Sequence, residues 1–318
     1  MHSGGEASKG LNLAACGRLP TISVVVAFRD SECCVLDCLD SILRMDYPHD
    51  HLEIIAVDDQ SSDALAAEIH KSYPNVRLLR SKSPKGCNSA KRDGALASTG
   101  DIVACTDADC LVGESWGRTI AKNLTDGADA VTGPVRHPKT LLRELVGIAD
   151  FPDYQDNRHR SANAYVGCNY AINRSLLHTF QFRDYEILFG GDRLDSWQLY
   201  SSGHKIAYDP DMVVQHYPQV DFANMLERRL RYGMKALEMR KIDPTLPGGR
   251  LIGLGYMAVP AYLAYKMIKD GLTVFGMLRQ GHVHPAHIPL VLPMLFLFRL
   301  LDSVGIVSAQ RGLRRKSR

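Results

Sequence analysis

The sequence has no large excess of charge of either sign. Its 38 Lys and Arg residues stand against 35 Asp and Glu residues, which leaves a formal net charge of +3 over 318 residues. Because a protein that binds a nucleic-acid backbone needs a concentrated excess of positive charge, this balance gives no indication of a nucleic-acid partner. Hydrophobic residues make up 45% of the chain and charged residues 23%, which excludes a collagen-like, low-complexity or largely disordered protein.

The eight cysteines include no C-x-x-C pair, and all of them lie within the first 168 residues. Several fall in apolar, strand-like runs, where a free thiol packs as a small hydrophobic group. This pattern favours the reducing cytosol over a disulfide framework. Residues 1–19 contain no apolar stretch that is long enough for a secretory signal, and we expect them to form a loose tail.

No uninterrupted apolar run reaches the roughly 18 residues that indicate a membrane span. Two shorter uncharged runs lie near the C-terminus, at residues 251–265 and 288–298. We expect residues 242–318 to form an apolar helical pair followed by a basic tail. The pair is either buried in protein or associated with a membrane, and the sequence leaves both arrangements open.

Before these runs, apolar strand-like segments alternate with helical ones. The predicted strands are 21–28, 52–57, 75–80, 101–106 and 128–133, and the predicted helices are 31–44, 63–72, 88–98, 114–125, 192–202 and 221–241. The first two strands are rich in β-branched residues without polar alternation, which predicts a parallel sheet covered by helices on both faces. Residues 134–190 look irregular, and residues 205–216 look extended. Ligands of such sheets bind at the carboxyl ends of the strands.

Carboxylates follow the second and fourth of these strands. TDADC places Asp107 and Asp109 two residues apart, and such a pair offers the oxygen ligands that Mg²⁺ or Mn²⁺ takes while it also holds a diphosphate. An Asp-x-Asp at a turn is also common as a solvated loop. Asp58 and Asp59 can accept hydrogen bonds from a base or a ribose, or can cap the helix that follows them.

Taken together, the motifs resemble those of the inverting family-2 glycosyltransferases, which adopt the GT-A fold. The shared features, in chain order, are VVVAFRD, VDDQSSD, the K-R-D-G segment 91–94, TDADC, YVGCN at 165–169, the G-D pair at 191–192 and the histidine of VVQHYP. The resemblance covers about residues 20–241. It implies an α/β domain with a GT-A-like, nucleotide-sugar-binding mixed sheet flanked by helices, before the apolar, membrane-associated region.

The resemblance also implies a role for individual residues. Asp192 matches the general base, and Asp109 matches the metal ligand. Asp107 would reach the ribose or the metal, and His216 would join the metal shell. The residues that would hold the nucleotide and its diphosphate are Ala27, Phe28, Asp58, Asp59, Arg92, Arg228, Arg229 and Arg231.

Several of these residues have other interpretations. His216 could instead be a packed or hydrogen-bonded histidine at a strand end. The arginines at 228, 229 and 231 could instead form a solvated or lipid-facing side of a helix. Trp197 either packs in the hydrophobic core or lines the binding site of the acceptor. The histidines at 282, 284 and 287 are predicted to lie in a loop.

The chain departs from the family pattern at three positions: Gly191 replaces a Glu, Asp93 an Asn and Gln60 a Gly. The first departure bears on how the acceptor is positioned. The chain also lacks Q-x-x-R-W, the signature of processive polysaccharide synthases, so a single transfer is expected. Asp195 is the nearest alternative to Asp192 as the base.

We therefore expect a metal-dependent, inverting glycosyltransferase that uses a UDP-linked nucleotide diphosphate sugar and a hydroxyl acceptor on a lipid or glycolipid. The cofactor would be Mg²⁺ or Mn²⁺. One alternative is a polyprenyl-phosphate sugar synthase; another is an inactive, nucleotide-sugar-binding membrane scaffold, which only Gly191 supports. The basic ending RGLRRKSR favours the cytoplasmic face of a membrane, with the apolar segments forming either a spanning hairpin or an interfacial pair.

Overall fold

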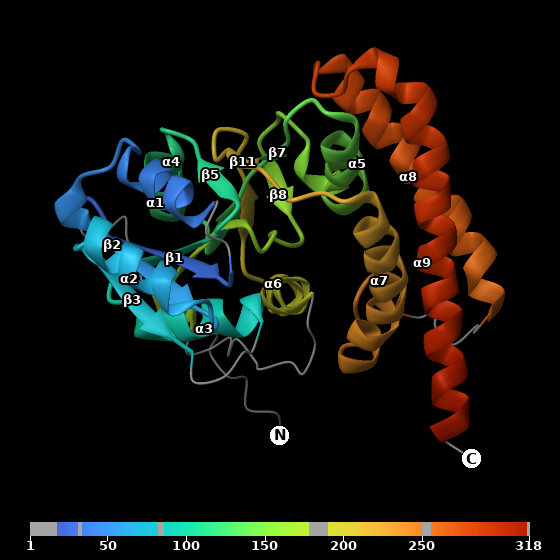
Figure 1. The fold of residues 1–318 in the computed structure, drawn as a ribbon, viewed down its shortest axis with the longest axis horizontal. Coiled ribbons are helices and arrows are strands. Elements are labelled where there is room, and N and C mark those ends of the chain that lie inside the picture. Colours follow the sequence, from blue (N-terminus) through green and yellow to red (C-terminus); the bar gives the residue numbers. More distant parts are fainter. Residues whose placement is uncertain (1–17, 31–33, 82–85, 178–189, 250–255, 317–318) are drawn as a thin grey trace. The chain divides into compact units, whose positions relative to one another are not determined.

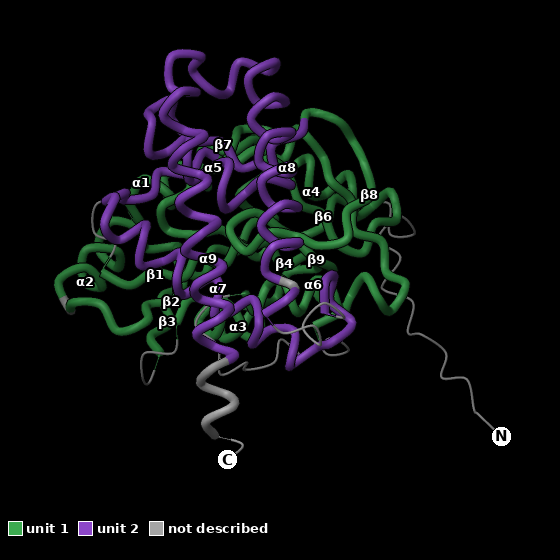
Figure 2. Tube along the Cα trace, turned by 90° about the vertical axis from the view of Figure 1, so that its right-hand side faces the viewer, with its two compact units in different colours: residues 1–134, 157–214 green, residues 135–156, 215–318 purple. Residues whose placement is uncertain are grey.

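The computed structural model describes residues 18–30, 34–81, 86–177, 190–249 and 256–316. Most of the predicted tail lies outside these residues, as do 31–33 of the first predicted helix and 251–255 of the first apolar run. The chain forms two compact units (Figure 2). Unit 1 comprises residues 1–134 and 157–214, and unit 2 comprises residues 135–156 and 215–318. The predicted domain ranges 20–241 and 242–318 stay a prediction.

Unit 1 is built on an eight-stranded sheet with the order β3-β2-β1-β4-β9-β6-β10-β8 (Figure 1). Its strands are β1 (Ile22–Phe28), β2 (Leu52–Asp58), β3 (Val76–Arg80), β4 (Ile102–Asp107), β6 (Ala130–Thr132), β8 (Arg160–Ala162), β9 (Asn169–Asn173) and β10 (Ile206–Tyr208). All seven residues of β1 are buried, as the lack of polar alternation predicted. The strand β5 (Cys110–Val112) follows β4 directly.

The helices of unit 1 agree with the predicted segments to within a few residues. They are α1 (Val35–Leu43), α2 (Asp63–Ser72), α3 (Cys87–Ala97), α4 (Trp116–Thr125) and α6 (Gly191–Ser201), with short 3₁₀ turns η2 (His49–His51) and η4 (Arg174–Leu177). Gly94 brings α3 close to the sheet, because a Cβ at this position would lie 2.4 Å from Val25 and 2.8 Å from Val57. The backbone of α3 therefore rests directly on β1 and β2.

The sheet is mixed, and here the strand pattern alone was misleading. Strands β1, β2, β3 and β4 are parallel, as predicted, but β9 pairs antiparallel with both β4 and β6. β9 lies in the segment 134–190, which looked irregular in the sequence. Its sequence, NYAIN, begins and ends with asparagine, a residue typical of turns, so it does not stand out as a strand. The mixed sheet is the one that the resemblance to GT-A enzymes implied.

Unit 2 is mainly helical. Its elements are β7 (Val135–Arg136), α5 (Leu141–Asp150), η3 (Pro152–Tyr154), α7 (Phe222–Ile242), α8 (Ala258–Arg279), η6 (Pro285–His287) and α9 (Ile288–Lys316), together with β11 (Val214–His216), which neighbours β7 and begins on the last residue of unit 1. The predicted helix 221–241 and the predicted apolar helical pair are thus confirmed as helices. One helical stretch, Pro285–Gln310, is long and apolar enough to cross a membrane by length and composition.

Glycines allow α7 and α9 to pack closely. A Cβ on Gly233 of α7 would lie 1.9 Å from the carbonyl oxygen of Asp302, and one on Gly305 of α9 would lie 2.2 Å from the carbonyl oxygen of Leu230. Real Cβ atoms do not approach an oxygen this closely, so both backbones would have to move apart. The two glycines therefore determine the spacing of these helices.

We expect Gly233→Ala to lower the free energy of unfolding by about 1 to 3 kcal/mol, because the added methyl group overpacks the α7–α9 contact. Gly271→Ala on α8 is the matched control, since nothing lies within 4 Å of its Cβ position. That substitution should be neutral or stabilising, as alanine favours a helix. Thermal unfolding followed by circular dichroism compares the two variants, and equal effects would contradict the packing.

Candidate functional site

The carboxyl ends of three neighbouring parallel strands bring several predicted site residues to one edge of the sheet in unit 1. In the strand register, Ala27 of β1 is opposite Asp107 of β4, and Phe28 of β1 is opposite Asp58 of β2. Ligands of open α/β sheets bind at this edge. The four residues therefore lie together where the resemblance placed a nucleotide, and their roles stay predictions.

Asp58 and Asp59 organise the loops around this edge. Asp58 is fully buried and its Oδ1 accepts a hydrogen bond from the amide of Ser61 at 2.6 Å, while Arg80 Nε lies 3.4 Å from its Oδ2. Asp59 Oδ2 accepts a hydrogen bond from the amide of Gly86 at 2.9 Å. Neither residue caps α2, because the N-cap position is Ser62.

Gln60 adopts a backbone conformation that is unusual for its residue type. Its φ is +74°, in the left-handed region that glycine tolerates best. This is the position at which the family pattern usually has a glycine. The Gln60 side chain donates a hydrogen bond to the carbonyl of Ser81, which helps to hold the strained turn after Asp59.

A buried lysine lies at the centre of the site. Lys91 on α3 is only 4% exposed, and its ammonium group forms an ion pair with Asp107 Oδ1 and donates a hydrogen bond to the carbonyl of Gly167 at 2.7 Å. Burial lowers the pKa of Lys91, but the neighbouring Asp107 carboxylate outweighs it and holds this pKa well above its usual value. Lys91 is therefore charged and neutralises Asp107.

Gly167 also contacts the predicted base, Asp192. Its amide donates a hydrogen bond to Asp192 Oδ2 at 2.8 Å, while its carbonyl accepts one from Lys91, so Gly167 links Lys91 to Asp192. A Cβ on Gly167 would lie 3.0 Å from Asp192 Oδ2, which leaves little room for a larger residue. Asp192 itself lies in the first turn of α6, just after Gly190, whose φ is +88°.

The surroundings of Asp192 tune its acidity. Burial raises the pKa of its carboxyl group above the usual value, and the Lys91 charge and the amides of Gly167 and Arg193 partly oppose this effect. A raised pKa brings a carboxylate closer to the proton affinity that general-base catalysis requires near neutral pH. Asp192 is only partly buried, which leaves it accessible to an acceptor.

Asp109 is the second residue of the two-residue turn between β4 and β5, and Ala108 separates it from Asp107. Its carboxylate is partly exposed, and a hard divalent cation favours oxygen ligands of this kind. Since Lys91 already occupies Asp107 Oδ1, Asp109 is the better candidate for the principal protein ligand. The residues of unit 1 thus fit the metal site that the sequence suggested.

His216 belongs to unit 2, at the end of β11. It is 8% exposed, its Nδ1 lies 3.0 Å from His137 Nε2, and its ring packs edge-on against that of Phe151. These contacts match the interpretation of a packed, hydrogen-bonded histidine at a strand end. Its place in a metal shell with Asp107 and Asp109 would join residues of the two units and stays a prediction.

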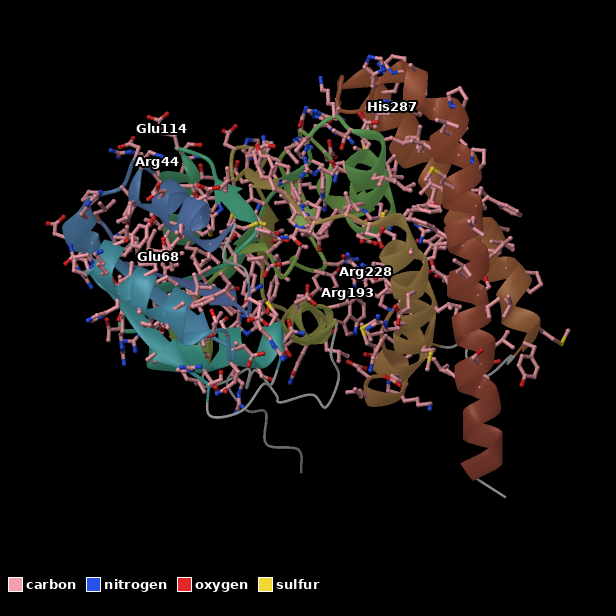
Figure 3. All side chains as sticks on the ribbon, viewed as in Figure 1. Arg44, Glu68, Glu114, Arg193, Arg228 and His287 are labelled. Carbon is pink, nitrogen blue, oxygen red and sulfur yellow. The ribbon has the colours of Figure 1, made fainter. Side chains whose placement is uncertain are left out.

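The three predicted arginines of α7 all have partners within unit 2. Arg229 is 4% exposed and forms an ion pair with Asp150, while Arg228 donates a hydrogen bond to the Tyr232 hydroxyl at 2.8 Å. Arg231 pairs with Glu227 along the exposed side of the helix. Figure 3 labels Arg228 on α7. Buried Arg229 is thus tied into the packing, and a role in diphosphate binding stays a prediction for all three.

The other residues singled out in the sequence lie on the elements that were predicted for them. Arg92 follows Lys91 on α3 and is partly buried, and Asp195 lies one helical turn beyond Asp192 on α6. Trp197 contacts Tyr200 on the same helix, with ring centroids 5.7 Å apart. The predicted histidine loop is confirmed as the connection between α8 and α9, which contains η6.

Lys91 is the candidate site residue that was not predicted from the sequence, where its neighbour Arg92 was the candidate. A sequence signal for it exists. On α3 the buried positions are Ser89, Ala90, Lys91, Gly94 and Ala95, so the lysine belongs to a stripe of small, helix-face residues. A buried lysine requires a carboxylate partner. Asp107, at the end of β4, is that partner, and its own side chain is partly exposed.

Comparison with known proteins identifies the family of the chain. Residues 23–180 match the family model of glycosyl transferase family 2. The chain is 22% identical over 271 residues to glycosyltransferase AglE of Haloferax volcanii, covering 80% of this chain and 88% of AglE. It is also 33% identical over 101 residues to a beta-monoglucosyldiacylglycerol synthase of Trichormus variabilis, which covers 30% of this chain and only 22% of that relative.

Two solved structures share the fold. The mannosyltransferase PcManGT from Pyrobaculum calidifontis, in complex with GDP-Man and Mn²⁺, has a TM-score of 0.60 and 18% identity, and the match covers 95% of this chain and 89% of that one. GalNAc-T7 with UDP, GalNAc and Mn²⁺ has a TM-score of 0.53 and 17% identity, over 64% and 44% of the two chains. With its mixed sheet, its Asp-x-Asp turn and the matched family model, the chain belongs to glycosyltransferase family 2 and has a GT-A fold.

Proposed function

We propose that this glycosyltransferase moves one sugar from a nucleotide diphosphate sugar to a hydroxyl group of a lipid or glycolipid, with inversion of the anomeric centre. The observation that carries the proposal is the network of Lys91, Asp107, Gly167 and Asp192 within unit 1. It joins the nucleotide edge of the sheet to a carboxylate with the properties of a general base. An inactive sugar-binding scaffold would have no need of this network.

In the proposed reaction, Asp192 accepts the proton of the acceptor hydroxyl as its oxygen attacks the anomeric carbon. The bond between that carbon and the diphosphate oxygen breaks in the same step, and the electron pair leaves with the diphosphate. One such in-line displacement inverts the anomeric centre. The Gly167 amide positions Asp192 through a hydrogen bond of 2.8 Å. A single displacement forms no covalent intermediate.

The nucleotide would lie across the strand ends formed by Ala27, Phe28 and Asp58, with Asp59 and Arg92 beside it. A UDP-linked donor is proposed from the resemblance, and the two structural neighbours named above were solved with GDP-Man or with UDP. Asp109 would hold the divalent cation, Mg²⁺ or Mn²⁺. When bound, this cation supplies positive charge that stabilises the leaving diphosphate.

A lipid acceptor is supported by the apolar helices of unit 2 and by the name of one relative, the beta-monoglucosyldiacylglycerol synthase. We place the protein on the cytoplasmic face of a membrane. The six cysteines within the described residues are all free thiols, which suits a reducing compartment. The basic residues at the end of the sequence favour the same side.

Two variants separate the base from the metal ligand. Asp192→Asn should lower turnover on the order of 10² to 10⁴-fold with donor affinity nearly unchanged, because it removes the proton acceptor and little else. Asp109→Ala should instead abolish Mn²⁺-dependent donor binding and leave the fold intact. Steady-state kinetics and donor titrations with and without Mn²⁺ distinguish the two effects.

A collapse of donor affinity in Asp192→Asn would move this residue to the nucleotide site. Unchanged turnover would favour a phosphate acceptor, which needs no base.

The pH dependence of turnover tests the role of Lys91. Asp192 must be ionised to accept a proton, so activity falls as the pH drops through its raised pKa. Lys91 stabilises the ionised form and lowers that pKa. Lys91→Met should therefore move the acid limb of the pH profile to higher pH.

The exposed Lys122 of α4 provides the matched control, because Lys122→Met removes the same charge at the surface of unit 1. The control should leave the acid limb in place. An unshifted limb in Lys91→Met, in a variant that still binds donor, would contradict the proposed link between Lys91 and Asp192.

A further inference from the structure

Three charged residues of the α8–α9 hairpin are buried, whereas many large apolar side chains of the same helices are exposed. Arg299 of α9 forms ion pairs with Asp270 of α8 at 2.7 Å and with Asp302 of α9 at 2.8 Å, and none of the three is more than 3% exposed. Arg299 also donates a hydrogen bond to the carbonyl of Ala149 on α5. A protein surface that faces water normally shows the opposite distribution.

The exposed faces of the two helices carry only apolar residues over most of their length. On α8 the large exposed side chains are Tyr265, Ile268, Leu272 and Phe275, and on α9 they are Leu290, Leu292, Phe296, Leu297, Leu300 and Val304. On α8 these residues are three or four positions apart, and on α9 they lie on both sides of the buried positions Val291, Leu295 and Phe298. At 100° per residue, each set falls on the side of its helix opposite the residues that are buried in the core of unit 2. We call these two sets the outer face of the hairpin.

The tip of the hairpin is attached to α5. His287 Nδ1 lies 2.8 Å from Glu144 Oε2, and the amide of His284 donates a hydrogen bond to Glu144 Oε1 at 2.9 Å. Glu144 is 1% exposed. Figure 3 labels His287 at this end of the hairpin. Since α5 lies beside the hairpin, a hairpin that crossed a bilayer would have to take α5 with it.

The helix α7, which packs against the middle of α9, carries exposed charged residues. Gly233 of α7 lies against the backbone of Asp302, and the exposed ion pair of Glu227 and Arg231 lies on the same α7 helix. Figure 2 shows α7, α8 and α9 as neighbouring rods within unit 2. If α9 spanned the membrane, the Glu227–Arg231 pair would enter the hydrocarbon, where ionised side chains are costly. A spanning hairpin is therefore inconsistent with the packing of unit 2.

We propose that the outer face of the α8–α9 hairpin is a membrane-docking surface that enters one leaflet of an anionic bilayer without crossing it. Arg279 ends α8, and the C-terminal residues 311–318 carry five basic residues and no acidic one, so positive charge is available for anionic headgroups. The docking surface thus specifies how a lipid acceptor would be reached, although it does not depend on the proposed transfer reaction.

Co-sedimentation of the full chain with phosphatidylcholine vesicles, with and without phosphatidylglycerol, tests the proposal. We expect binding that is stronger with phosphatidylglycerol. Leu272→Glu and Phe296→Glu should each weaken it about tenfold, because each replaces a large apolar side chain that the lipid would cover. Leu96→Glu is the matched control, since Leu96 is an exposed leucine on α3 of unit 1, and its binding should be unchanged.

Binding that survives both Glu substitutions would overturn the proposal, as would a stable dimer that does not bind vesicles. Thermal unfolding of each variant verifies the fold. Hydrolysis of the nucleotide sugar without lipid is measured on the same samples. Loss of vesicle binding with hydrolysis retained supports the docking surface, whereas vesicle binding by a chain that never hydrolyses a donor refutes only the proposed function.

A labelling experiment on an otherwise unchanged chain tests the depth of insertion. Ala286 is exposed at the tip of the hairpin, between the residues that bind Glu144. In intact cells that express Ala286→Cys, a membrane-impermeant maleimide should add no label beyond that of the unsubstituted chain, and the extra label should appear after lysis. Extra labelling from outside intact cells would mean that the hairpin crosses the membrane and would overturn the one-leaflet arrangement.

Discussion

The ion pair between Lys91 and Asp107 is the interaction on which the candidate site of unit 1 depends. A lysine that is 4% exposed must have a partner, because an unpaired buried charge is strongly destabilising. Here the ammonium group joins α3 to the end of β4 and to the carbonyl of Gly167, whose amide in turn holds Asp192. The predicted nucleotide edge and the predicted base, Asp192, therefore belong to one electrostatic network, and a change in any member alters the others.

Much of this arrangement could be predicted from the sequence, because it depends on local patterns. The β-branched runs of β1 and β2 and the carboxylates that follow β2 and β4 identify the strand ends, and Asp192 follows from the resemblance. β9 could not be predicted, since its pairing depends on tertiary contacts: the Asn169 side chain bonds Trp116, Pro134 and Met212. The contact of Lys91 with the Gly167 carbonyl could not be predicted for the same reason, because Gly167 lies 76 residues further along the chain.

In unit 2, the hydropathy of the sequence predicted the helices but did not predict which of their sides are buried and which are exposed. Arg299, Asp270 and Asp302 interrupt the apolar runs in the sequence and made a membrane span look poor. In the structure they neutralise one another inside the unit, and the apolar residues between them remain exposed. A hydropathy window averages over the faces of a helix, so it cannot separate a buried charged side from an apolar outer side. Only the packing against α5 and α7 makes this distinction.

The central claim is that Asp192 acts as the base in a single displacement at the anomeric carbon. The most direct measurement is proton NMR of the sugar that is first released when the chain hydrolyses an α-linked nucleotide sugar, recorded before the anomers equilibrate. With water as the acceptor, the account predicts that the β anomer forms first. First release of the α anomer would show retention of configuration, and this result would contradict the role given to Asp192.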